Sequence, residues 1–156
     1  MSHWEAPHAA TVEASVCPLW EHFAHEADIG IRGYGATQDQ SFERAAIALI
    51  AVMTDPSTIR GETRVEIVSH LQAPSREILL YDWLNAVIYQ MVTRHMLFAR
   101  FVVQTTSDGL TGIALGEPID ELRHEPAVEI KGATMTCLAV EQVNSGLYMA
   151  QCVVDI

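Results

Sequence analysis

Two apolar patterns of helical period constrain the fold of this chain more than any other feature of its sequence. Apolar residues recur at the i, i+3, i+4, i+7 spacing of one helix face, first at Phe42, Ala45, Ala46, Leu49, Ile50 and Met53 and again at Leu80, Trp83, Leu84, Val87, Ile88 and Met91. Thr37 and Gln40 form a capping box before the first segment. Ser75 and Glu77 mark the start of the second, where the helix dipole favours negative charge. The sequence therefore predicts two long, well-buried helices.

The remaining segments alternate apolar and polar residues with the period of two that is typical of strands. Strands are expected over residues 19–23, 29–34, 65–71, 97–103, 110–115, 128–130 and 147–155. Residues 135–140 either continue the strand at 128–130 or form the next strand. Gly109 and Gly146 close two hairpin turns. Because the strands cluster instead of alternating strictly with the helices, the sequence predicts an α+β fold. We expect a mixed or antiparallel sheet of about seven to eight strands, packed with two main helices in a single domain.

Length and composition suit one folded domain. The chain has 156 residues, of which 49% are apolar, enough for one sizeable core. Residues 1–16 contain a proline and several small or polar residues, and we expect a flexible N-terminal extension there, before a domain of residues 17–156. No apolar run reaches the roughly 18 residues of a membrane crossing, and the first residues lack the pattern of a signal peptide.

The cysteines indicate a reducing compartment. Cys17, Cys137 and Cys152 are odd in number and show no C-x-x-C spacing, so we expect a cytoplasmic protein with free thiols. Cys137 and Cys152 fall in apolar strand patterns, which predicts that both are small core residues.

The net charge of −11 limits the partners of this chain. Its nine Lys and Arg residues are scattered, whereas phosphate contacts need clustered basic side chains. We therefore expect no direct binding of nucleic acid. An acidic surface suits a basic protein partner, because opposite fields speed their encounter.

A first candidate site is the segment of residues 22–30. His22, His25 and Asp28 follow one another at intervals of three, which could suggest zinc. On a strand, however, residues i and i+3 face opposite sides, so the zinc interpretation is weak. The competing interpretation of Asp28 is a turn residue that bonds its own backbone.

A second candidate site is the chain end. Asp155 and Ile156 place a side-chain carboxylate beside the terminal one, after an apolar strand. Termini are usually frayed, but Val153 and Val154 would hold this one in the sheet. Carboxylate and carbonyl oxygens suit a hard cation such as Ca²⁺ or Mg²⁺. A third, diffuse set comprises Glu117, Asp120, His124 and Lys131, which solvated surface positions would explain equally well.

Ordered blocks of the sequence resemble the archease family. Residues 25–35 (HEADIGIRGYG) are similar to the family's H-T-A-D-[VI]-G block, and residues 79–85 (LLYDWLN) to its L-L-x-x-W-L-N helix. The other blocks, in family order, are residues 51–55 (AVMTD), 98–101 (FARF), 116–120 (GEPID), His124, 130–134 (IKGAT) and Asp155-Ile156. Together they span roughly residues 19–156. The resemblance departs at Glu26 for Thr, at Met135-Thr136 for an aromatic residue and His, and at Ser75 for an acidic residue.

Archeases are accessory proteins of RtcB-type RNA ligases, which seal tRNA halves and broken RNA ends. The resemblance implies that this chain promotes guanylylation and repeated turnover of such a ligase and is not itself an enzyme. It also implies a divalent cation, Ca²⁺ first and Mg²⁺ or Mn²⁺ as alternatives, held by Asp28, Asp155 and Ile156. We expect His25 and Lys131 to lie nearby and to orient the partner. Two alternatives remain: a chaperone-like protein-binding module, and a metal-dependent phosphoesterase that uses the same carboxylates.

Overall fold

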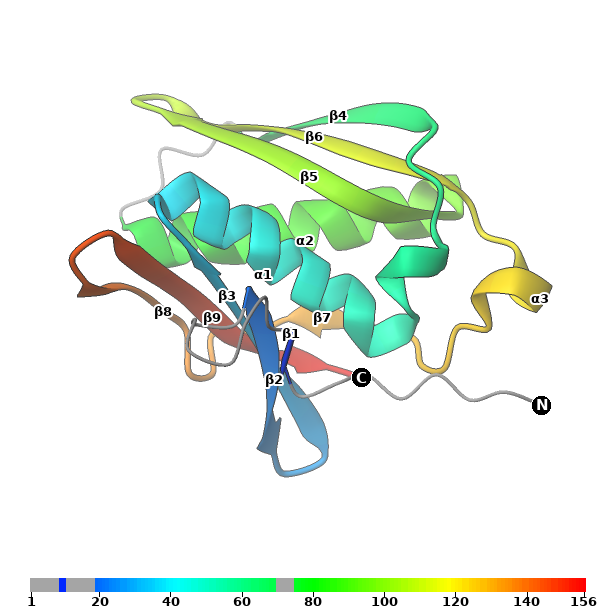
Figure 1. Ribbon diagram of the computed structural model, residues 1–156, viewed down its shortest axis with the longest axis horizontal. Coiled ribbons are helices and arrows are strands. Elements are labelled where there is room, and N and C mark those ends of the chain that lie inside the picture. The colour runs from blue at the N-terminus through cyan, green and yellow to red at the C-terminus, as the bar shows by residue number, and fades with distance from the viewer. Residues whose placement is uncertain (1–8, 11–18, 70–74) are drawn as a thin grey trace.

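Two helices lie between two antiparallel sheets in the computed structural model, which describes residues 9–10, 19–69 and 75–156 (Figure 1). In chain order the elements are β1 (Ala9–Ala10), β2 (Trp20–His25), β3 (Asp28–Gly35), α1 (Gln38–Met53), the 3₁₀ turn η1 (Pro56–Thr58), β4 (Thr63–Ser69), α2 (Arg76–Arg94), β5 (Met96–Thr106), β6 (Gly109–Pro118), α3 (Glu121–His124), β7 (Gly132–Ala133), β8 (Ala139–Asn144) and β9 (Leu147–Asp155). The expected flexible extension over residues 1–16 lies outside the described residues apart from β1, and Cys17 lies outside them too.

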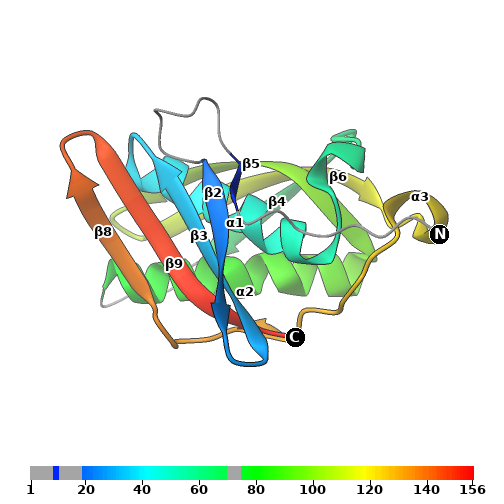
Figure 2. The same cartoon turned by 60° about the horizontal axis from the view of Figure 1, so that its bottom comes forward.

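The α+β class is confirmed, with the strands divided between two sheets. The larger sheet has six strands in the order β1-β2-β3-β9-β7, with β8 paired to β9. The smaller sheet has the order β4-β6-β5. Figures 1 and 2 show α1 and α2 side by side between the two sheets, with their C-terminal ends on the same side of the molecule.

Both predicted helices are confirmed at their starting residues. The Thr37 side chain accepts a hydrogen bond from the Gln40 N–H, and the Ser75 side chain accepts one from the Ile78 N–H. Ser75, which stands where the family often has an acidic residue, is thus a helix cap that satisfies a free N–H group. The two helices share one core, and the indole of Trp83 donates to the carbonyl of Phe42 across them at 3.1 Å.

Glycines in β3 let α1 approach the large sheet closely. A Cβ on Gly33 would lie 2.1 Å from the backbone nitrogen of Ala45, and one on Gly35 would lie 2.7 Å from that of Ser41. Such distances exclude any side chain, because packed carbon atoms need about 3.5 Å or more. Odd-numbered residues of β3 therefore face the helices, and even-numbered ones, Asp28 among them, face outward.

The strand expected at residues 128–130 is wrong. The chain from Glu125 to Lys131 is irregular, although Ile130 is buried. Its backbone bonds to the ends of other elements, since Ala127 donates to the carbonyl of Met53 and Lys131 donates to that of Asp155. The apolar residues of this segment are thus explained by the burial of Ile130 and do not indicate a strand.

The strand expected at residues 135–140 begins only at Ala139, after a turn. Cys137 lies in that turn, exposed and with a φ of 54°, so its predicted place in the core is wrong. Cys152 is buried as predicted, and burial raises the pKa of its thiol to about 12. No helix in the described ranges is long and apolar enough to cross a membrane.

Candidate functional site

The register of the large sheet brings the β2–β3 hairpin beside the end of the chain. His25 pairs with Asp28, and Asp155 pairs with Gly132 of β7. The β3–β9 ladder runs to Ile29 opposite Val154, so one further step sets Asp28 opposite Asp155. Residues opposite each other in antiparallel strands have side chains on the same face, with Cβ atoms about 5 Å apart. The row His25–Asp28–Asp155 therefore lies on the outer face of the sheet.

A hydrogen bond joins Asp28 of this row to the last residue of the sequence. The backbone N–H of Ile156 donates to Oδ1 of Asp28 at 3.4 Å, a long but direct bond. Asp28 is half-buried and Asp155 is exposed. Asp28 is the first residue of β3, and the loop of the hairpin is Glu26 and Ala27 alone. The carboxylate of Asp28 thus bonds the chain end, which the turn-residue interpretation does not describe.

Lys131 reaches the same place through its backbone. Its N–H donates to the carbonyl of Asp155 at 2.8 Å, and its side chain is exposed. Neither Lys131 nor the neighbouring Glu129 lies in a strand. The backbone of Lys131 is thus fixed beside Asp155, while its side chain lies at the surface.

The two histidines of the hairpin do not converge. His22 faces the helices, where its Nε2 lies 2.8 Å from the carbonyl of Ala48 in α1. His25 lies three residues further along the strand, on the outer face. The zinc interpretation from the H-x-x-H-x-x-D spacing therefore has no geometric support.

The neighbouring rows of the outer face are firmly packed. The ring of Phe23 lies across Gly30, where a Cβ would be 2.2 Å from the ring. The guanidinium of Arg32 lies 4.6 Å from the centre of the Phe23 ring and pairs with Glu21 at 2.6 Å. The glycine of the H-x-A-D-x-G block thus admits the aromatic ring that supports the start of β3.

The oxygen groups of the row fit a hard cation. Asp28 and Asp155 supply side-chain carboxylates, and Ile156 has a backbone carbonyl oxygen beside them in the chain. Ca²⁺ and Mg²⁺ take such donors and complete their shells with water. Within the described residues no three His, Cys, Asp or Glu side chains gather closely enough to hold an ion, so Ile156 would have to supply the third protein group.

The third candidate set divides between two places. Glu117 is buried and accepts hydrogen bonds from the backbone of Arg60, the guanidinium of Arg123 and Nε2 of His124. The pairing with Arg123 is the main reason that the pKa of Glu117 falls to about 2. Nδ1 of His124 accepts from the N–H of Asp120 at 2.8 Å. These hydrogen bonds connect Glu117 of β6 with Arg123 and His124 of α3 and with Arg60 in the loop before β4, so the role of the cluster is to hold these three segments together.

Sequence reasoning missed Arg123 in this cluster. Asp120 caps α3 and accepts hydrogen bonds from the N–H groups of Leu122 and Arg123. The spacing of Asp120 and Arg123 was the available signal. An Asp that caps a helical turn has its side chain on the same side of the chain as the residue three positions later. Lys131, by contrast, lies beside Asp155, because its backbone N–H donates to the carbonyl of Asp155.

Comparison with known proteins agrees with the resemblance seen in the sequence. The model of the Archease protein family matches residues 20–156. Protein archease of Pyrococcus furiosus is 40% identical over 141 residues, which cover 88% of this chain and 98% of that protein. Protein archease of Sulfolobus acidocaldarius is 36% identical over 139 residues and covers the same shares.

A solved structure has the same architecture. The solution structure of Methanobacterium thermoautotrophicum protein 1598 matches with a TM-score of 0.70 and 36% sequence identity. The match covers 88% of this chain and 99% of that one. Sequence and fold thus point to the same group of proteins.

Proposed function

This chain belongs to the archease family, and we propose that it is an accessory protein that activates an RtcB-type RNA ligase. The observation that supports this role most is the bond between Asp28 and the backbone of Ile156. It ties the β2–β3 hairpin, which carries the H-x-A-D-x-G block of the resemblance, to the Asp155-Ile156 pair. The resemblance implies that these residues act together, and the role places the protein in the cytoplasm with the ligase.

In this proposal Asp28, Asp155 and Ile156 hold a divalent cation, Ca²⁺ first. The cation supplies a positive centre with coordination positions left for groups of the partner. Asp155 offers its carboxylate from an exposed position, and the bond from Ile156 fixes the orientation of Asp28. His25 in the row and Lys131 beside it orient an anionic partner group, such as a phosphate.

The exposed position of the row supports docking over independent catalysis. Asp155 and Lys131 are exposed, and Asp28 is only half-buried on an outer sheet face. An enzyme site for a small substrate is usually a concave pocket that excludes water. The apolar pocket beside the C-terminal ends of α1 and α2 is lined by neither Asp28 nor Asp155.

The proposal is tested by adding the protein to its cognate ligase and counting guanylylations and ligation turnovers. Wild type should raise both, while Asp28→Ala and Asp155→Asn should lose about tenfold or more of the effect, as loss of a metal ligand or its support does. Asp108→Ala is the matched control, because Asp108 is exposed at the tip of the β5–β6 hairpin. Equal stimulation by wild type and Asp28→Ala would exclude the proposed site.

The same preparations separate the alternatives. Metal-stimulated hydrolysis of a phosphoester by the isolated protein, abolished by Asp155→Asn, would indicate a phosphoesterase. Suppressed aggregation of unrelated proteins without a ligase would indicate a chaperone-like module. Under the proposed function neither activity appears.

A further inference from the structure

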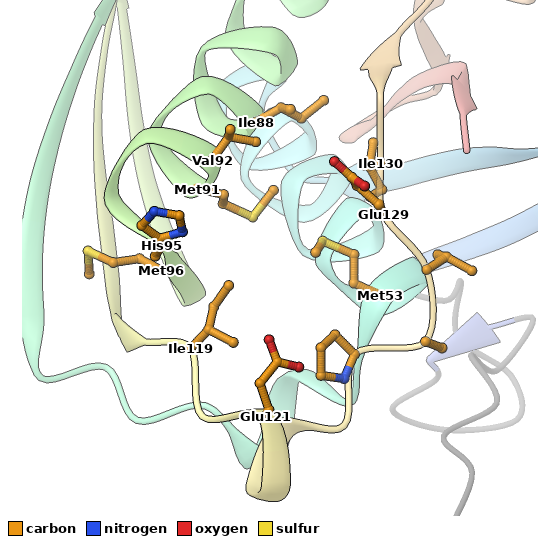
Figure 3. Close-up of a pocket in the computed structure, with 13 residues that line it drawn as sticks. Met53, Ile88, Met91, Val92, His95, Met96, Ile119, Glu121, Glu129 and Ile130 are labelled. Carbon is orange, nitrogen blue, oxygen red and sulfur yellow. The ribbon is translucent and has the colours of Figure 1, made fainter.

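An apolar pocket of about 510 Å³ opens beside the C-terminal ends of α1 and α2 (Figure 3). Its walls include three methionines and three isoleucines: Met53, Met91, Met96, Ile88, Ile119 and Ile130. This volume is within the range of ordinary ligand pockets, about 300 to 1,000 Å³. Methionine side chains adapt their shape readily, which suits a surface that receives another protein's side chain.

The border of the pocket is negatively charged. Glu121 and Glu129 both line the pocket and lie on two different sides of it (Figure 3). Both residues are exposed, and neither forms an ion pair with any other residue that the structure describes. Charged side chains without a partner beside an apolar hollow favour an occupant of opposite charge.

The helix ends add to this preference. Met53 is the last residue of α1, and His95 caps the end of α2, and both line the pocket. The C-terminal end of a helix carries a partial negative charge. No basic residue lies in the last turn of α1 to offset it, whereas Arg94 lies in the last turn of α2, so the contribution comes from the end of α1.

The charge of this chain makes its own N-terminal residues and a second copy unsuitable occupants of the acidic-bordered pocket. Residues 1–18 contain Glu5 and Glu13 but no Lys or Arg. A second copy would bring a further net charge of −11. Like charges across an interface oppose association.

We propose that this pocket receives a large apolar side chain from a basic segment of a protein partner. The apolar side chain fills the space between the methionines, and flanking Lys or Arg residues meet Glu121 and Glu129. Buried aromatic or aliphatic anchors with charged neighbours are the usual centres of binding energy in such contacts. The pocket adjoins the Asp28–Asp155 row through Ile130 and Lys131, but its occupation needs neither a cation nor a ligase.

The methionines themselves report occupation. In the full-length protein labelled with ¹³C at the methionine methyl groups, Met53, Met91 and Met96 lie in the pocket, while Met135 and Met149 lie outside it. The probes are three capped tripeptides: Arg-Trp-Arg, Glu-Trp-Glu and Arg-Ser-Arg. Arg-Trp-Arg should shift the three pocket methyl signals in a saturable way and leave Met135 and Met149 unchanged. The other two peptides should shift them little.

Charge variants test the border. Glu121→Gln combined with Glu129→Gln should weaken Arg-Trp-Arg binding roughly threefold to tenfold, the loss expected for two exposed ion pairs. Glu141→Gln, an exposed position on β8, should bind as wild type does. Both variants change only surface side chains, so unchanged spectra of the free proteins show that they are folded.

Four results would overturn the proposal. Glu-Trp-Glu could shift the pocket methyl groups as strongly as Arg-Trp-Arg, or none of the peptides could shift them. Trp4→Ala could move the same signals in the free protein, which would make the chain's own N-terminal segment the occupant. Dilution without peptide could move them, which would make the occupant a second copy.

Discussion

At the scale of single residues, the left-handed backbone of Glu26 is the clearest local strain near the candidate site. Its φ is 54°, in the two-residue loop that joins β2 to β3. A residue with a Cβ adopts the left-handed region at a cost of about 1 kcal/mol or more, whereas glycine adopts it without this cost.

Glu26→Gly should therefore raise the free energy of unfolding by about 0.5 to 1 kcal/mol, after the greater freedom of glycine in the unfolded chain is subtracted. Chemical denaturation at neutral pH measures this difference. Ala27→Gly is the control, because Ala27 shares the loop but has no positive φ; it should be neutral or destabilising. A destabilised Glu26→Gly protein would show that the glutamate side chain supports the hairpin.

At the scale of elements, the Glu117–Arg123 pair connects α3 to the small sheet. Because the pair needs an ionised carboxylate, it makes the free energy of unfolding depend on pH in the acid range. The folded pKa of Glu117, about 2, is below its unfolded value of about 4.3. A group with a lowered folded pKa stabilises the fold fully above its unfolded pKa. That contribution is lost as the pH falls from about 4.5 toward 2.

Glu117→Gln should accordingly lower the free energy of unfolding at neutral pH by about 2 kcal/mol, the order of a charge-assisted hydrogen-bond set. The loss should shrink as the pH falls below about 4.5, because wild type then loses the same interaction. Thermal melts of both proteins between pH 2.5 and pH 7 check this. Equal melting differences at every pH would contradict the role given to the carboxylate, and Glu141→Gln serves as the surface control.

Sequence periodicity predicted the helices and strands that bury one face and whose backbone groups form the regular hydrogen bonds of a helix or a sheet. The faces of α1 and α2, the β5–β6 hairpin and the bounds of β9 are such cases. It failed at Ile130, which is buried while its neighbours bond to other elements. Nor could alternation divide the strands into two sheets, because it shows which face is buried and not which strands pair.

The candidate site was beyond pattern reasoning for the same reason. Asp28 and Asp155 are 127 positions apart, and only the resemblance to archeases connected them. The pairing of β3 with β9 then sets both on one row. The apolar pocket was unpredicted as well, since Met53 and Met91 have the pattern of ordinary core residues.

At the scale of the whole molecule, the two surfaces that we propose to be functional are neighbours on one acidic body. The outer row of Asp28 and Asp155 offers carboxylates to a cation, and the pocket beside it offers apolar walls with an acidic border. The net charge of −11 attracts a basic partner to both. Metal and anchor would then hold one partner at two points, and two linked contacts bind more tightly than either alone.

The most direct measurement of the central claim is an anomalous difference map from crystals of the full chain grown with Ca²⁺. We predict a peak on the outer face of the large sheet, about 2.3 to 2.6 Å from carboxylate oxygens of both Asp28 and Asp155 and beside Ile156. A map with Ca²⁺ bound elsewhere, or with the two aspartates ordered and no peak between them, would contradict the account.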